Sequence, residues 1–246
     1  MWTAAMWGGI SGTAVLLGAL TAIFFPINRT IIGFIMAFGT GVLIGAVAYE
    51  LLEEPVQEGG MVPVSIGFLA GAGIFTAFDY MVSRKGAHKR KRSDATRDGS
   101  KAGLAIFIGT VMDAIPESIM IGSSLTVEKN VSFLLVTAIF ISNIPEGLSS
   151  TSGLINSGYS KLKVFFLWFT VMIISAISSW AGYFFLSDAS DAVMAGIASF
   201  AGGGIIAMIG STMMPEAYED GGPVTGLIVA LGLQVSLLLN FWSQLP

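Results

Sequence analysis

The stretches "MDAIPESIMIG" (residues 112–122) and "SNIPEGLSSTSG" (residues 142–153) decide the fold. Each one places the tripeptide Ile-Pro-Glu inside a segment that is otherwise largely apolar. Proline removes the amide that would bond the carbonyl four residues earlier in a helix. A charge at the centre of a bilayer costs at least ~2.5–3.5 kcal/mol and normally faces the interior of a helix bundle. Two such segments therefore indicate a pair of membrane helices whose polar residues face the bundle interior and serve the function of the protein.

The composition of the whole chain points to the same environment. Of its 246 residues, 54% are hydrophobic and 11% are charged, whereas soluble domains carry about 25% charged residues. The absence of cysteine excludes disulfides, thiolate metal sites and cysteine nucleophiles. Nucleic-acid binding has no support, because the one basic cluster lacks interleaved aromatic residues. We therefore predict an all-α polytopic membrane protein.

Eight stretches are long and apolar enough to be spanning helices, each of which needs about 20 residues. The first lacks a positively charged leading region, so we interpret it as a helix and not as a cleavable signal. We predict a single transmembrane domain over residues 1–246, with three helices within 1–83, a basic loop at 84–101, two helices within 102–157 and three within 162–245. The predicted helices are 1–25, 31–53, 61–83, 102–127, 131–157, 162–187, 190–217 and 221–245.

Lysine and arginine predict the orientation, because cytoplasmic loops carry an excess of positive charge. With both termini outside, 11 of the 12 positive residues face the cytoplasm and only Lys129 does not. The 11 are Arg29, Arg84, Lys85, Lys89, Arg90, Lys91, Arg92, Arg97, Lys101, Lys161 and Lys163. The basic loop is interpreted as a topology determinant and solvated linker; binding of anionic lipid headgroups is the alternative.

An internal repeat is predicted from two segments that align without gaps. Residues 38–60 match residues 200–222, including Phe38 with Phe200 and Glu54 with Glu216. The match pairs predicted helices 2 and 3 with predicted helices 7 and 8, five helices later. Because five is odd, the two copies cross the membrane in opposite directions. The two Ile-Pro-Glu helices are also inverted relative to each other. This gives a 3+2+3 inverted-repeat arrangement, which is a common plan of transporters.

The polar residues of the two motifs are oxygen donors placed on helix faces. Asp113 and Glu117 are four residues apart, as are Ser142 and Glu146, so each pair shares one face. Carboxylates packed in a low dielectric repel one another, and a divalent cation relieves that repulsion. The predicted metal ligands are Asp113, Glu117, Ser142, Asn143 and Glu146. The alternative is a pair of proline-kinked helices with protonated carboxyl groups bonded to the backbone.

At these residues the chain resembles the ZIP (Zrt/Irt-like) family of divalent-metal transporters, in its prokaryotic form. The resemblance is carried by "DAIPES" (113–118), "SNIPEG" (142–147) and "MMPEA" (213–217). It implies eight transmembrane helices in a three-two-three inverted arrangement and a metal site between the two central helices. It implies that Glu117 and Glu146 bridge the metal, with Asp113 where the family usually has its first histidine. Elevator-like movement and a homodimer are likewise implied by the resemblance.

Two departures from the family pattern bear on the metal. None of the predicted helices contains histidine, so the core motifs are free of imidazole, which should leave Mn²⁺ or Fe²⁺ more competitive with Zn²⁺. Ala114 replaces the usual asparagine and cannot ligate, which favours one well-formed site.

Two acidic clusters are predicted to lie on opposite faces of the membrane. Glu50 belongs to the outer cluster and Glu216 to the inner one, and these two lie nearest the apolar segments. We expect them to concentrate cations at the entrance and to release them at the exit. Acidic helix ends that are simply solvated are the alternative.

The predicted function is transport of divalent transition-metal cations (Zn, Mn or Fe class) into the cytoplasm. The cation is the substrate, and no organic cofactor is expected. A non-transporting metal sensor or receptor with a degenerate site is one alternative. An intramembrane enzyme is another, since paired carboxylates can do acid–base work, but neither a Gly-x-Gly-Asp nor a His-Glu-x-x-His segment is present. The compact loops suggest a prokaryotic inner membrane.

Overall fold

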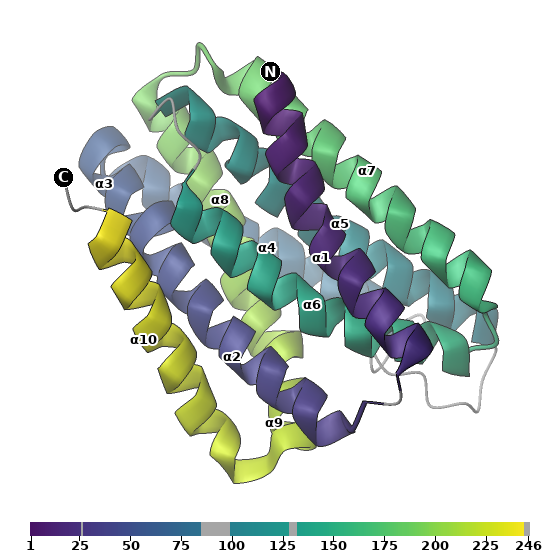
Figure 1. The fold of residues 1–246 in the computed structure, drawn as a ribbon. Helices are drawn as coiled ribbons and strands as arrows, with labels where there is room; N and C mark the ends of the chain where they lie inside the picture. Colours follow the sequence, from purple (N-terminus) through teal and green to yellow (C-terminus); the bar gives the residue numbers. More distant parts are fainter. Residues whose placement is uncertain (26, 85–98, 128–131, 244–246) are drawn as a thin grey trace.

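The computed structural model describes residues 1–25, 27–84, 99–127 and 132–243, and these residues form helices and connections without a β-strand (Figure 1). The all-α prediction is confirmed for this part of the chain. The predicted basic loop lies almost entirely outside the described residues. The elements are α1 (Trp2–Phe24), α2 (Arg29–Ala48), η1 (Tyr49–Glu53), α3 (Glu54–Gly59), α4 (Met61–Arg84), α5 (Gly99–Val127), α6 (Phe133–Asn156), α7 (Lys161–Leu186), α8 (Asp191–Met208), η2 (Ile209–Met213), α9 (Met214–Gly221), η3 (Gly222–Val224) and α10 (Thr225–Ser243).

Seven helical stretches among the described residues are long and apolar enough to cross a membrane. The last of them, Asp191–Ser243, has 53 residues and would be about 80 Å long if straight. It covers most of both helices predicted at 190–217 and 221–245, so the structure gives seven such stretches where the sequence predicted eight. Gly222, with φ +68°, interrupts this stretch, and Figure 1 shows α10 running back beside α2.

Short polar side chains fix the start of α2 and of α6. The side chain of Asn28 accepts a hydrogen bond from the Thr30 amide at 3.0 Å and begins α2. Ser132 accepts from Leu135 at 3.1 Å and begins α6. These caps satisfy amides that have no partner within the helix, which is why the spans begin at these residues.

The two motif prolines do not end their helices. Pro116 lies inside α5 and Pro145 inside α6, and both helices continue as α-helix on either side. Proline is tolerated in membrane helices where neighbouring groups satisfy the freed carbonyl. Each Pro-Glu pair is thereby held in the middle of a span, as the sequence predicted.

The two segments that align in sequence share an order of elements. In each, a long helix (α2 or α8) passes into a five-residue π-helix (η1 or η2) and then into a short helix with proline at its start (α3 or α9). Each short helix is followed by a glycine with positive φ, Gly60 at +88° and Gly222 at +68°. The π-helical turns were not predicted from the sequence, and π-helical turns occur frequently at functional sites.

The helices pack in two groups. The first consists of α1, α5, α6 and α7, in which α1 lies against α6 and α7, and α5 lies against α7. The second pairs α4 with α8 and α2 with α10. The groups meet closely where α2 packs on α6, and much less closely where α5 faces α8. We call this loosely packed boundary the α5–α8 seam.

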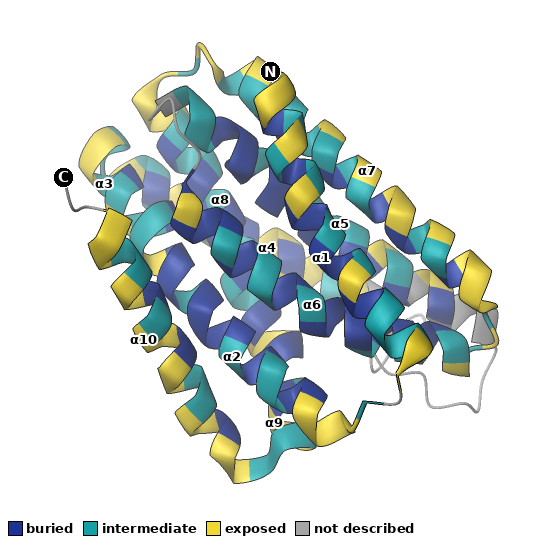
Figure 2. Ribbon diagram, viewed as in Figure 1, coloured by how far each residue is buried: buried dark blue, intermediate teal, exposed yellow. Residues whose placement is uncertain are grey.

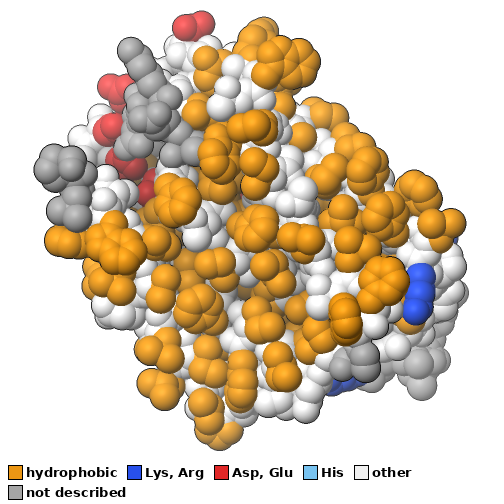
Figure 3. Space-filling model, in the orientation of Figure 1, with side chains coloured by type: hydrophobic (Ala, Val, Ile, Leu, Met, Phe, Trp, Pro, Cys, Tyr) orange, Lys and Arg blue, Asp and Glu red, His pale blue; other side chains and the backbone are white. Residues whose placement is uncertain are grey.

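Buried residues line the interior of the bundle, and apolar side chains cover the outside (Figures 2 and 3). In the face shown in Figure 3, acidic side chains lie near α3 at one end and basic side chains at the opposite end. Figure 1 shows that α1 begins and α10 ends at the end of the bundle where α3 lies. An apolar belt between charged ends is the surface that a bilayer requires.

Candidate metal site

All five predicted ligands are buried, on α5 and α6. Asp113 is 7% exposed, Glu117 2%, Ser142 2%, Asn143 5% and Glu146 2%. Ionisable side chains are almost never buried to this extent without partners, and within a membrane span they mark functional sites by default. The sequence therefore identified a real concentration of buried oxygen donors.

Asp113 and Glu117 line one pocket in the α5–α8 seam. The pocket encloses about 440 Å³ of open space, and its other walls come from α4 and α8. Pro116 also lines the pocket, so the residue of α5 that lacks a backbone N–H lies at the pocket wall. The walls across from α5 include Phe75, Ala201 and Met208. Two carboxylates thus share a cavity that is otherwise mainly apolar.

Glu146 lies across from α5 and contacts it through a residue that the sequence analysis did not single out. The hydroxyl of Thr110 donates a hydrogen bond of 3.1 Å to Oε1 of Glu146. Thr110 is 3% exposed, so the bond is sheltered from solvent. It links the two Ile-Pro-Glu helices at the level of their carboxylates.

The three motif carboxylates do not form one cluster in this arrangement. Among the residues the structure describes, no group of three or more His, Asp or Glu side chains is placed to hold a metal ion. Asp113 and Glu117 share the pocket, whereas Glu146 does not line it. The structure therefore brings together two of the predicted carboxylates and places the third on the facing helix.

Ser142 belongs to the closely packed side of α6. The Ser142 hydroxyl donates to the carbonyl of Ile139 at 3.0 Å. Gly39 of α2 packs directly on this turn, and a Cβ there would lie 3.0 Å from the Cα of Ser142. The α2–α6 boundary is thus closed at Ser142, in contrast to the open α5–α8 seam at Asp113.

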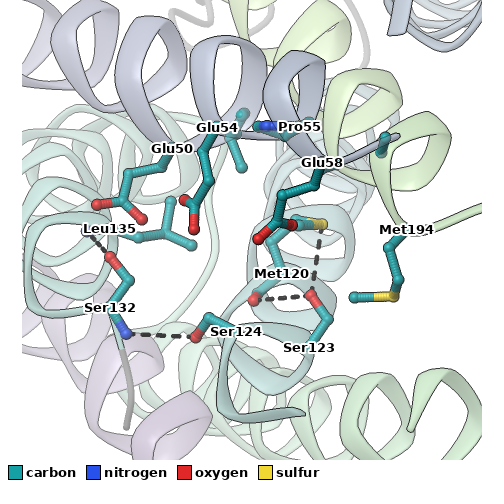
Figure 4. Close-up of a pocket in the computed structure, with 13 residues that line it drawn as sticks. Glu50, Glu54, Pro55, Glu58, Met120, Ser123, Ser124, Ser132, Leu135 and Met194 are labelled. Carbon is teal, nitrogen blue, oxygen red and sulfur yellow. Dashed lines mark hydrogen bonds between the residues drawn. The ribbon is translucent and has the colours of Figure 1, made fainter. Parts of the chain in front are cut away.

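A second pocket, the acidic vestibule, lies further along the same seam (Figure 4). It encloses about 520 Å³ of open space. Glu50, Glu54 and Glu58 project into it from η1 and α3, toward serines on α5 and at the start of α6. The other polar and sulfur-containing residues of the lining are Met120, Ser123, Ser124, Ser132 and Met194.

The vestibule and the carboxylate pocket share their two long walls. Met120 and Ser124 of α5 line the vestibule and follow Glu117 by three and seven residues, a spacing that keeps them on one helix face. On α8, Ala198 lines the vestibule and Ala201 lines the pocket. The α5–α8 seam thus runs from the acidic vestibule to Asp113 and Glu117.

Glu216 is half-buried on α9 and approaches α6 from the opposite end. The Ser149 hydroxyl donates to Oε2 of Glu216 at 3.5 Å. Ser149 follows Glu146 by three residues, so it lies one helical turn further along α6. Glu216, the predicted exit carboxylate, therefore contacts α6 directly through Ser149.

Sequence reasoning missed Thr110, Ser149 and the serines of the vestibule. Thr110 precedes Asp113 by three residues and Glu117 by seven, and this helical spacing is the signal that would have found it. No comparable signal pointed to Ser132, because its role depends on the start of α6 lying beside α5, where the Ser132 amide donates to Ser124 Oγ at 3.3 Å.

No family model matches the chain. The chain is similar to an Arabidopsis thaliana protein that bears the name "Putative zinc transporter", with 27% identity over 212 residues. The aligned region covers 84% of this chain and 33% of the relative. The chain therefore resembles this protein over most of its own length, and it spans about a third of the length of the curated relative it matches.

Proposed function

We propose that the protein transports divalent transition-metal cations of the Zn, Mn or Fe class across a membrane, into the cytoplasm. The observation that carries the proposal is the burial of five oxygen donors on α5 and α6, two of them carboxylates that line a pocket within a membrane span. The similarity to a protein named as a zinc transporter supports metal transport in general.

The donor set determines the class of ion. Carboxylate, hydroxyl and amide oxygens suit hard and borderline divalent cations. The chain's single histidine, His88, lies outside the described residues and outside every predicted helix, so no imidazole is expected in the spans. We propose that Mn²⁺ and Fe²⁺ compete with Zn²⁺ at a single site made from Asp113, Glu117, Ser142, Asn143 and Glu146.

The α5–α8 seam is the proposed route to that site. Cations are concentrated by Glu50 and its neighbours in the vestibule and pass along α5 to Glu117 and Asp113. Glu146 completes the site when α6 shifts toward the occupied pocket, because a bound cation removes the repulsion between carboxylates. Glu216, joined to α6 through Ser149, receives the cation on the other side.

The proposed membrane arrangement has eight crossings in a 3+2+3 inverted repeat, with both termini outside. Because α1 begins and α10 ends on the same side of the bundle, the number of crossings from α1 to α10 is even, and the shared order of elements around η1 and η2 supports the repeat. Membership of the ZIP family, a homodimer and a prokaryotic inner membrane belong to the same proposal. A non-transporting sensor remains the second candidate.

The test is metal uptake by vesicles that contain the purified protein. Mn²⁺ and Zn²⁺ uptake would be compared for the wild type, Glu117→Gln and Glu146→Gln, which remove charge and keep the shape of the side chain. Glu53→Gln is the matched control, because Glu53 is exposed. We expect both motif variants to lose most uptake and the control to keep it.

Other outcomes separate the alternatives. Metal binding by the wild type without uptake would favour the sensor. Uptake that survives both motif substitutions would refute the site. If the wild type neither takes up nor binds Mn²⁺ or Zn²⁺, the proposed function is refuted.

A further inference from the structure

We propose that Thr110 is a positioning residue for Glu146, and that it determines how tightly the site holds its cation. The inference rests on the proposed function, and it adds a residue that the sequence motifs do not contain. Thr110 acts through its hydroxyl, which donates to Oε1 of Glu146 across the α5–α6 boundary.

The acceptor of this hydrogen bond, a carboxylate on another helix, distinguishes Thr110 from a buried threonine such as Thr40. A threonine in a helix commonly bonds to a carbonyl of the preceding turn. Thr40 does so on α2, where its hydroxyl donates to the Met36 carbonyl at 2.8 Å. Thr110 instead reaches a carboxylate on another helix, 36 residues further along the chain.

Its position on α5 matches this role. Thr110 lies on the same helix face as Asp113 and Glu117, which line the pocket. Its hydroxyl therefore holds the carboxylate of α6 against α5, about one helical turn before Asp113. Because Thr110 is 3% exposed and Glu146 is 2% exposed, water can hardly reach the hydrogen bond to compete with it.

The chemistry of a carboxylate ligand explains why such a donor affects affinity. An ionised carboxylate has about four acceptor positions, so one hydroxyl donor leaves others for a cation. Carboxylates that bind metals are usually held by such outer hydrogen bonds, and removing one typically lowers metal affinity or activity about 10- to 100-fold. Because Thr110 orients Glu146, we expect its loss to affect metal affinity more than folding.

The experiment uses the full chain in vesicles and in detergent. Thr110→Val keeps the shape and removes the donor, Thr110→Ser restores the donor, and Thr40→Val is the matched control at a buried threonine with a bond inside its own helix. For each, the KM and maximal rate of Mn²⁺ uptake are measured, together with the melting temperature with and without Mn²⁺.

We expect Thr110→Val to raise the KM for Mn²⁺ uptake about tenfold or more. Without Mn²⁺ its melting temperature should equal that of the wild type, and adding Mn²⁺ should raise it much less than it raises the melting temperature of the wild type. Thr110→Ser should recover KM, and Thr40→Val should leave KM unchanged. A wild-type KM in Thr110→Val would overturn the inference, as would a melting temperature lowered equally with and without Mn²⁺. Failure of the wild type to bind and transport Mn²⁺ would instead refute the proposed function.

Discussion

Thr110 and Glu146 connect the two proline-containing helices by a buried hydrogen bond of 3.1 Å. The bond places the α6 carboxylate beside α5, although Glu146 does not line the pocket that Asp113 and Glu117 share. The proposed metal site is therefore divided between two helices, and its properties should depend on how those helices pack.

Asp113→His tests whether the missing imidazole sets the metal preference. Imidazole suits Zn²⁺ better than Mn²⁺, so the variant should shift the ratio of Zn²⁺ to Mn²⁺ uptake toward Zn²⁺, by roughly tenfold. Competition between the two ions in the vesicle assay measures this ratio. An unchanged ratio in a variant that still transports would show that position 113 does not contact the cation.

Pro116→Ala tests the backbone contribution of the motif. The variant restores an amide that can bond to the Met112 carbonyl, and interior proline costs a helix about 3 kcal/mol. We expect a free energy of unfolding equal to or higher than that of the wild type, with lower uptake. Thermal unfolding in detergent and vesicle uptake measure the two quantities. Unchanged uptake would show that the proline serves only the shape of α5.

Charge in the vestibule should matter for capture of the cation and not for the later steps. We expect Glu50→Gln combined with Glu54→Gln to raise the KM for Mn²⁺ up to roughly tenfold at low ionic strength and to leave the maximal rate unchanged. The difference should shrink at about 0.1 M salt, where screening acts over about 10 Å. Glu219→Gln, on the exposed part of α9, is the control. An effect independent of salt would contradict electrostatic capture.

Single cysteines test the route, and the chain is suited to this because it contains none. Met194→Cys lies in the vestibule at a half-buried position, so a charged thiol reagent added outside should modify it, and Mn²⁺ should slow the reaction. Ala138→Cys is the control, since Ala138 is fully buried. Modification of Met194→Cys only from the inside would reverse the proposed orientation.

Gly147→Ala tests the packing behind Glu146. A Cβ at Gly147 would overlap the carbonyl of Val15 on α1, and overpacking typically costs about 1–3 kcal/mol. We expect a lower melting temperature in detergent. Gly226→Ala is the matched control, because no atom lies within 4 Å of a Cβ there. Equal stability of the two variants would show that α1 and α6 can separate at this point.

Much of the fold was predictable because the bilayer imposes it on the sequence. Length and hydropathy located the spans, and the two Ile-Pro-Glu motifs located the buried oxygen donors. Their burial was predictable because a polar group in an apolar span must face the bundle interior. The last two helices predicted from the sequence fall within one apolar helical stretch of the structure, Asp191–Ser243, which is interrupted at Gly222.

The arrangement of the site was not predictable from local pattern. Periodicity shows which face of a helix is buried, but not which helix covers it. The contact of Thr110 with Glu146, the π-helical turn at Glu50 and the contact of Ser149 with Glu216 all depend on packing between distant segments.

By itself, the sequence determined an apolar helical chain with segregated charge and a set of buried oxygen donors without imidazole in its predicted spans. Only the tertiary structure decided that α2 closes on α6 at Ser142 while α5 and α8 leave an open seam beside Asp113 and Glu117. The physical reason is that membrane helices associate through close packing of small residues. Whether a glycine such as Gly39 finds a partner surface is a property of the assembled bundle and not of its own segment.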